Sequence, residues 1–220
     1  GLVAHYKFDE ASGTVATDSS GNSNTGTLTN GPTWTTGKIG NALDFDGVND
    51  SVDITGISVG TTHTFSFWLN RSDDGYIFDS NSGRLVISMG ASATANNLNF
   101  YDGAWKALGA VSANQWHHIA LVLNGGNNTA TGYLDGALLG TASYTPTAIG
   151  SLTRLGNHNN VDNDATATYT GLLDEFRIYN RALTTTDIQT LFALGTGGTP
   201  PPPDTQAPTT PTNLSATAVL

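Results

Sequence analysis

Residues 118–123 read His118-Ile-Ala-Leu-Val-Leu123, a stretch that carries apolar side chains on both faces if the backbone is extended. Successive side chains of a strand point to opposite faces of its sheet. Ile119, Leu121 and Leu123 therefore share one face, and the residues between them lie on the other. A strand that is apolar on both faces is typical of the centre of a covered sheet. The stretch predicts a central strand.

Three further patterns complete the fold prediction. Residues Thr64-Phe-Ser-Phe-Trp-Leu69 alternate with a period of two and predict another strand. Asp135-Gly136 lies between two short apolar stretches and is a strong signal for a type I′ hairpin turn. Thr184-Thr-Thr-Asp187 matches a capping box that opens a short helix, with Gly195 as its stop. Many short strands and one late helix predict an all-β fold, a two-sheet antiparallel jelly-roll sandwich with one short C-terminal helix.

The composition changes near Gly195, which divides the chain into residues 1–195 and residues 196–220. Four consecutive prolines, Pro200 to Pro203, favour an extended spacer because proline cannot enter the interior of a sheet. The piece that follows, from about Ala207, resembles the truncated start of a fibronectin type III module. We therefore expect one folded domain and a proline-rich linker, cut from a larger modular protein.

Charge and composition exclude several classes of partner. The chain has eight Lys and Arg residues against eighteen Asp and Glu, a formal net charge of −10. This balance argues against nucleic acid and anionic membranes, and no apolar run reaches the roughly 20 residues that span a bilayer. No cysteine is present, so disulfides and thiolate chemistry are excluded. The chain starts at Gly1 without a leader, which indicates a mature or excised piece of a secreted protein.

Seven short motifs occur in order along residues 2–195. They are Val3-Ala-His-Tyr-Lys-Phe-Asp-Glu10, Asp18-Ser-Ser-Gly-Asn22, Gly40-Asn-Ala-Leu-Asp-Phe-Asp-Gly47, Phe65-Ser-Phe-Trp68, Gln115-Trp-His-His118, Tyr133-Leu-Asp-Gly136 and Gly171-Leu-Leu-Asp-Glu-Phe-Arg-Ile-Tyr-Asn-Arg-Ala-Leu183. Together they closely resemble the laminin G-like domains of the concanavalin A-like lectin/glucanase superfamily. The resemblance implies a secreted or cell-surface bacterial protein, a curved jelly roll that often contains calcium, and attachment to a polysaccharide-active enzyme or an adhesin. It does not imply one function, because a fold hosts many.

A first calcium site is predicted at the loop that holds Asp18, Asn22 and Asn24, because calcium prefers carboxylate, amide and backbone oxygens. The resemblance to laminin G-like domains implies Asp174 as the distant partner of this loop. Asp174 is expected to share a strand face with Phe176, and a buried carboxylate needs a cation or several donors. The alternative is that Asp18 only caps its own turn.

A second possible metal site combines Asp162 and Asp164 with Asp79 and Asn81. Pentraxins, relatives within the same superfamily, place calcium on loops at these positions, where the metal also holds the ligand. The alternative is a solvated loop rich in Asn and Asp.

Catalysis has little support in the sequence. A glycosidase needs two carboxyl groups that flank the scissile bond, and the glucanases of the resembled superfamily carry two Glu on one strand. This chain has only Glu10 and Glu175, far apart in sequence. Neither a lyase motif nor a Ser-His-Asp grouping stands out, so we expect a protein that is not an enzyme.

Aromatic residues in loops or on an outer sheet face point instead to carbohydrate binding, because aromatic faces stack on sugar rings. We predict a non-catalytic, calcium-containing, lectin-like module. It would be monomeric and would bind an oligosaccharide or polysaccharide, preferably neutral, beside other domains of its polypeptide. A structural or adhesion spacer without a ligand is the alternative, and a lyase or glycosidase domain ranks third. The predicted ligand-binding residues are Trp105, Tyr76, Tyr101, Asn159, Asp162 and Asp164.

Overall fold

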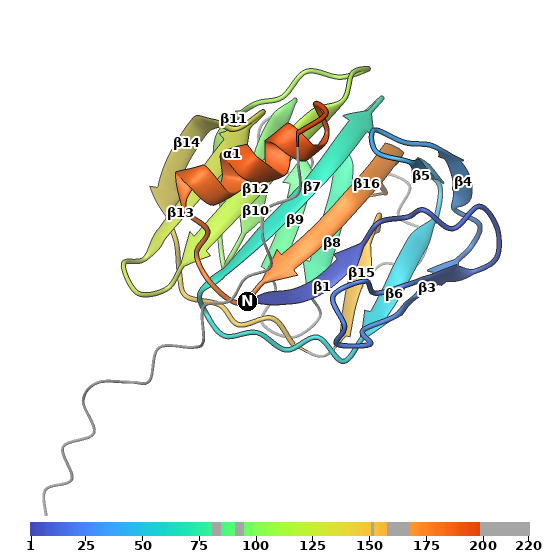
Figure 1. The fold of residues 1–220 in the computed structure, drawn as a ribbon. Helices are drawn as coiled ribbons and strands as arrows, with labels where there is room; N and C mark the ends of the chain where they lie inside the picture. Colours follow the sequence, from blue (N-terminus) through green and yellow to red (C-terminus); the bar gives the residue numbers. More distant parts are fainter. Residues whose placement is uncertain (81–84, 91–94, 151, 158–167, 199–220) are drawn as a thin grey trace, which may run out of the picture.

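The structure is a computed structural model that describes residues 1–80, 85–90, 95–150, 152–157 and 168–198. In this part of the chain, two antiparallel sheets of eight strands each pack face to face (Figure 1). Sheet A has the order β14 (Ala137–Ser143), β13 (Thr129–Leu134), β12 (His117–Asn124), β7 (His63–Arg71), β16 (Thr170–Tyr179), β5 (Asn41–Asp46), β4 (Thr33–Thr36), with β1 (Leu2–Tyr6) also paired to β16. Sheet B has the order β11 (Trp105–Ala110), β10 (Asn97–Tyr101), β9 (Leu85–Met89), β8 (Gly75–Ser80), β15 (Leu152–Leu155), β6 (Ser51–Thr55), β3 (Gly26–Thr29), β2 (Val15–Ala16). The predicted sandwich is confirmed.

The stretch at residues 118–123 forms most of β12, which lies between β13 and β7. Ile119, Leu121 and Leu123 enter the main core between the sheets. Ala120 and Val122 enter a second core on the outer face of sheet A, where helix α1 (Thr185–Leu194) covers them. The strand is apolar on both faces because each face has its own covering layer.

The helix begins and ends as the sequence predicts, with one difference in the reason for Gly195. Thr184 and Asp187 form the capping box: the Asp187 backbone N–H donates to the Thr184 hydroxyl, and the Thr184 N–H donates to the Asp187 carboxylate. Gly195 has a right-handed φ of −76° and does not need a left-handed conformation. Packing requires glycine at position 195, because a Cβ atom there would lie 2.2 Å from the Trp68 ring.

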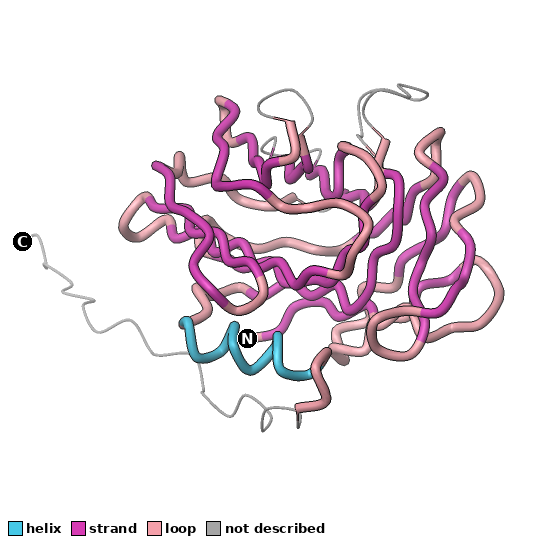
Figure 2. Tube along the Cα trace, turned by 90° about the horizontal axis from the view of Figure 1, so that it is seen from above, coloured by secondary structure: helices cyan, strands magenta, loops and turns pink. Residues whose placement is uncertain are grey.

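The β13–β14 hairpin also matches its prediction. Asp135 has φ +51° and Gly136 has φ +77°, the two positive values that a type I′ turn requires. The helix lies on one side of the two strand layers (Figure 2). Its placement covers the outer face of sheet A. No helix in the described ranges is long and apolar enough to cross a membrane.

Candidate functional site

An aromatic cluster occupies the outer face of sheet B, near the β11 edge. Tyr76 and Val86 form a cluster separate from the main core, with Tyr101 and Trp105 packed against it. The strand register explains the grouping, because Tyr101 of β10 is opposite both Trp105 of β11 and Val86 of β9. Residues distant in sequence therefore meet on one face.

The rings of this cluster have defined geometry. Tyr76 and Trp105 stack with their centroids 6.0 Å apart and their planes at 28°. Tyr101 meets Trp105 edge to face, at 5.4 Å and 62°. Tyr101 and Trp105 are half-buried. Three of the predicted ligand-binding residues thus lie together.

The same row of cross-strand neighbours continues to a polar end. Val86 is opposite Asp79 of β8, Asp79 is opposite Arg154 of β15, and Arg154 is opposite Asp53 of β6. Arg154 Nε donates to Asp53 Oδ1 at 2.6 Å, and the Thr29 hydroxyl donates to Asp53 Oδ2 at 3.1 Å. Sequence reasoning missed Arg154 and Asp53 as site residues, because their place depends on strand register that alternation alone does not give.

The second predicted metal site falls largely outside the described residues, which exclude Asn81, Asp162 and Asp164, as well as the predicted ligand-binding Asn159. Its remaining member, Asp79, is buried within the polar part of the row. The prediction of a metal at this cluster stays a prediction.

The Asp18 carboxylate makes four hydrogen bonds with the protein. Oδ1 accepts from the backbone N–H groups of His5 and Ser20, at 2.9 and 2.8 Å. Oδ2 accepts from the Ser20 hydroxyl at 2.8 Å and from the Asn24 N–H at 2.9 Å. Burial acts to raise the pKa of Asp18, but these bonds outweigh it and hold the pKa below its usual value. Because an ionised carboxylate has about four lone-pair sites, this arrangement does not fit a calcium ion bound to Asp18.

The two asparagines of the loop face the N-terminal strand through their amide groups. Asn22 Nδ2 donates to the backbone oxygens of Leu2 and Val3, and Asn24 Nδ2 donates to Val3 O at 2.9 Å. The loop is thus fastened to β1 by hydrogen bonds, in keeping with the alternative that Asp18 caps its own turn.

Asp174 makes fewer hydrogen bonds than Asp18 and is more deeply buried. It is fully buried, Oδ2 accepts from the Ile39 N–H at 2.8 Å, and Oδ1 has no hydrogen-bond partner. Burial, with the charges of Glu175 and Asp9, raises the pKa of Asp174 to about 7. Its oxygens therefore fit a cation, since one of them has nothing else to bind. Asp18 and Asp174 have no hydrogen-bond partner in common.

The prediction that Asp174 shares a strand face with Phe176 is wrong. A bulge between Asp174 and Arg177 places one more residue on β16 than on β7, with Glu175 at φ +54°. The bulge places Asp174 opposite Trp68 on the outer face of sheet A. Phe176 lies on the inner face, in the main core. Burial of Asp174 comes from the β4–β5 turn and not from the space between the sheets.

Comparison with known families assigns this domain to a superfamily. The family profile described as the concanavalin A-like lectin/glucanases superfamily matches residues 45–189. The chain belongs to the concanavalin A-like lectin/glucanases superfamily. No curated protein gives a significant match.

Solved structures of this fold include several binding domains. Domain 4 of AbnA, a GH43 extracellular arabinanase from Geobacillus stearothermophilus solved with arabinotriose, is 24% identical with a TM-score of 0.70, covering 86% of this chain and 97% of that one. The binding domain of Paraclostridial Mosquitocidal Protein 1 is 19% identical with a TM-score of 0.68, covering 87% of this chain and 51% of that one. A Trypanosoma rangeli sialidase in complex with sialic acid is 18% identical with a TM-score of 0.66, covering 90% and 34%. At these identities the likeness establishes the fold.

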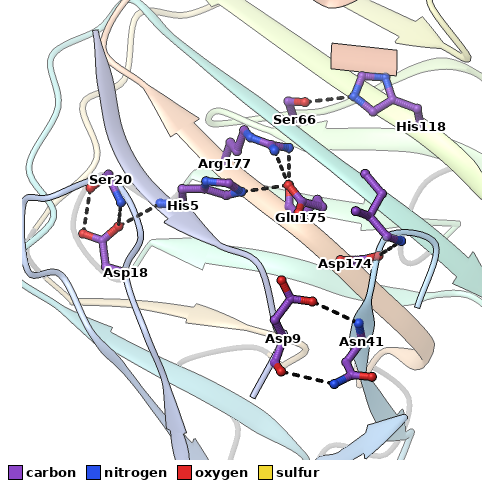
Figure 3. A network of polar contacts seen from close by, with 11 residues as sticks. His5, Asp9, Asp18, Ser20, Asn41, Ser66, His118, Asp174, Glu175 and Arg177 are labelled. Carbon is purple, nitrogen blue, oxygen red and sulfur yellow. Dashed lines mark hydrogen bonds and ion pairs between the residues drawn. The ribbon is translucent and has the colours of Figure 1, made fainter. Parts of the chain in front are cut away.

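The superfamily includes glucanases, and a glycosidase needs two carboxyl groups at its site. The surroundings of Glu10 and Glu175 therefore bear on whether they could serve together. Glu175 is buried, accepts from His5 Nε2 at 2.8 Å and pairs with Arg177 (Figure 3). Burial acts to raise the pKa of Glu175, but the bond with His5 and the charge of Arg177 hold it below its usual value. Glu10 accepts from the Thr17 N–H at 2.7 Å. The two carboxylates thus have different hydrogen-bond partners.

A chain of polar contacts that the sequence did not reveal joins Ser112, His117 and Asp135. His117 Nε2 lies 2.7 Å from the Ser112 hydroxyl, and His117 Nδ1 lies 2.7 Å from Asp135 Oδ2. Asp135 Oδ1 also accepts from the His118 N–H at 2.9 Å, and Gln115 Nε2 donates to the Ser112 hydroxyl. These bonds fasten the β13–β14 turn to β12 and to the loop that precedes it.

Proposed function

We propose that this domain is a non-catalytic carbohydrate-binding module of a secreted modular protein, and that it binds a neutral glycan on the outer face of sheet B. The observation that carries the proposal is the cluster of Trp105, Tyr101 and Tyr76, which places stacked and edge-to-face rings beside a polar row. Aromatic faces with a few fixed polar groups are what a sugar site needs.

The direction of the row suggests how a glycan chain would lie. From Trp105 on β11 to Asp53 on β6 the row crosses five strand spacings, about 24 Å at the usual separation of neighbouring strands. Val86 and Asp79 in the middle of the row are buried, so a glycan would contact the protein at the two ends of the row. The aromatic end would stack on the sugar, and the Arg154–Asp53 pair would offer hydrogen bonds to hydroxyl groups.

Two further observations support a neutral glycan. Eight basic residues against eighteen acidic ones make a polyanionic glycan a poor electrostatic match. The structurally similar AbnA domain was solved with arabinotriose, a neutral sugar. A structural calcium ion, which the family resemblance implies, also belongs to the proposal. Of the predicted ligands Asp18 and Asp174, only Asp174 has a carboxylate oxygen to spare.

Calorimetry against soluble neutral oligosaccharides, starting with arabino-oligosaccharides, tests the proposal. Trp105→Ala should weaken binding by about 1–3 kcal/mol, roughly 5- to 150-fold in Kd, as truncation at the centre of a binding site does. Trp34→Ala is the matched control, because Trp34 is also half-buried but lies on β4 of sheet A, with its indole N–H donating to Gly13 O. Wild type should bind, and the Trp34 variant should retain that affinity.

The outcomes separate the candidate functions. Unchanged affinity in Trp105→Ala would place the site elsewhere, and lack of affinity for every glycan would favour the structural spacer. Asp162→Ala combined with Asp164→Ala should abolish binding only if the second cluster holds an ion that bridges to the ligand. Repeating the titration in chelator then separates a bridging ion from a structural one.

A further inference from the structure

Two adjacent histidines at the start of β12 each contact a serine hydroxyl, and as neighbours on a strand they lie on opposite faces of sheet A. His118 Nε2 lies 2.9 Å from the buried Ser66 hydroxyl (Figure 3), and its Nδ1 is buried without a partner among the described residues. His117 Nε2 lies 2.7 Å from the hydroxyl of the exposed Ser112, and its Nδ1 lies 2.7 Å from Asp135 Oδ2. Of the two pairs, only that of His117 combines a carboxylate behind the histidine with a serine that solvent reaches.

The contacts of His117 decide which ring nitrogen carries the proton. An ionised carboxylate can only accept a hydrogen bond, so the proton of the neutral imidazole lies on Nδ1 and is donated to Asp135. Nε2 is then the acceptor, and the Ser112 hydroxyl is the donor. A general base needs this arrangement, because the same nitrogen takes the hydroxyl proton when the oxygen attacks.

Asp135 is itself held in place by backbone groups. Its Oδ1 accepts from the His118 N–H at 2.9 Å, and the Asp135 N–H donates to His118 O at 2.9 Å. Both bonds join the β13–β14 turn to the backbone of β12, which keeps Oδ2 at His117 Nδ1. A histidine that is fixed in this way keeps both its tautomer and its orientation.

The loop that carries Ser112 is anchored on both sides of that residue. The buried Arg71 side chain donates from Nη2 to Val111 O at 2.6 Å, and the Asn114 N–H donates to Arg71 O at 2.8 Å. The Gln115 side-chain amide donates to the Ser112 hydroxyl. A hydroxyl oxygen has two lone pairs, so this bond leaves one for attack. It also places a donor beside the reacting oxygen, where negative charge develops during acyl transfer.

We propose that Ser112 is a nucleophile, activated by His117 and positioned through Asp135, and that it takes the acyl group of a small carboxylic ester. Ser112 Oγ forms a bond with the carbonyl carbon while its proton moves to His117 Nε2. The bond from that carbon to the ester oxygen then breaks, and the proton passes to the departing alcohol. The serine gains one acyl group and one alcohol is released. The transfer leaves glycosidic bonds intact and does not depend on the proposed glycan site.

Covalent labelling of the full chain tests the proposal. A fluorophosphonate probe reacts with activated serine hydroxyls, because the oxygen bonds to phosphorus and fluoride leaves. p-Nitrophenyl acetate delivers an acetyl group and releases nitrophenolate, which absorbance measures. Mass spectrometry with peptide mapping should place both groups on Ser112. Two internal controls should stay unlabelled: Ser143, which is exposed on β14, and Ser66, which is buried beside His118.

Three variants identify the parts of the site. Ser112→Ala should remove the label, and His117→Gln should slow acetylation by about 100-fold or more, as loss of a general base does. Asp135→Asn should slow it by at least about tenfold, because an asparagine amide can donate to Nδ1 and so favour the wrong tautomer. Asn-Gly suits a type I′ turn as well as Asp-Gly does. The Asp135 variant should therefore keep its Tm within a few degrees of wild type, which separates lost reactivity from lost structure.

A thiol at the same position provides a second readout. The chain has no cysteine, so Ser112→Cys carries a single thiol beside His117. An adjacent histidine favours the thiolate, which is the form that iodoacetamide alkylates. Alkylation should be several times faster in Ser112→Cys than in the double variant that also carries Asp135→Asn.

Two results would overturn the proposal. One is labelling of Ser112 that is no faster than labelling of Ser143. The other is an Asp135→Asn variant that is acetylated at the wild-type rate, because His117 and Asp135 would then only link the strand to the turn. Ser112→Ala should bind oligosaccharide as wild type does, so either result leaves the proposed glycan site to its own test.

Discussion

Two buried histidines should make the domain sensitive to mild acid. His63 is fully buried and donates from Nδ1 to Gly60 O at 2.9 Å, while its Nε2 is buried without a partner. His118 is buried beneath the helix, with Nε2 at 2.9 Å from the Ser66 hydroxyl and Nδ1 unpartnered. Burial lowers the pKa of His63 to about 4 and, with the charge of Arg177, that of His118 to about 3.

The sign follows from proton linkage. Each histidine titrates near 6.5 in the unfolded chain and well below 5 in the folded protein, so between these values the unfolded state binds more protons. Stability is therefore complete above pH 6.5 and is lost as the pH falls. From pH 7 to pH 5 each histidine should cost about 2 kcal/mol, and this figure is insensitive to the folded pKa as long as it stays below 5. Together they should lower the free energy of unfolding by about 4 kcal/mol, or Tm by about 8–16 °C.

The assay is urea unfolding at several pH values between 5 and 7.5 for wild type, His63→Asn and His118→Gln. Asparagine keeps a donor near the position of Nδ1, and glutamine keeps a polar group near that of Nε2. Each variant should differ from wild type by about 2 kcal/mol in the change of its free energy of unfolding between pH 7 and pH 5. The raised pKa of Asp174 acts in the opposite direction in protein without a bound cation, but it is common to all three proteins and cancels in the difference. Variants that keep the full wild-type slope would refute the reasoning.

Two further predictions concern the end of the domain. Thr184→Ala should lower the free energy of unfolding by about 1 kcal/mol, because the helix loses the hydroxyl that accepts from the Asp187 N–H; chemical denaturation measures this, and an unchanged midpoint would show that the cap is unimportant. Deleting the residues after Gly197 should leave Tm within a few degrees of the full chain, because the two cores are built from residues before it. Loss of cooperative unfolding in the truncated protein would contradict the boundary.

The strands, the hairpin and the helix were predictable because their signals are local. Alternation along β12, the Asp135-Gly136 turn and the Thr184 capping box each depend on a few neighbouring residues. The strand pairings that complete the site were not predictable in this way. Arg154 and Asp53 join the aromatic end of the row only through the order of strands in sheet B.

One inserted residue made the predicted face of Asp174 wrong, although the strand itself was predicted correctly. Alternation along β16 predicted one face for Asp174 and Phe176, and the bulge at Glu175 reversed it. The polar type of the residue still indicated that a buried carboxylate would need a partner, and one oxygen of Asp174 is buried without one. Residue chemistry was therefore the more reliable guide here, and periodicity was less so.

The two outer faces of the sandwich differ because only one of them has a helix. On sheet A, α1 covers β12 and β7, so polar groups such as His118 and Ser66 are buried there and can only support the structure. On sheet B the rings of Tyr101 and Trp105 stay half-exposed although apolar residues lie beside them. Trp34 on sheet A is half-buried as well, so Trp105 is distinguished by its ring contacts with Tyr76 and Tyr101 and not by exposure alone. Affinity in Trp105→Ala is therefore the measurement on which the binding proposal depends.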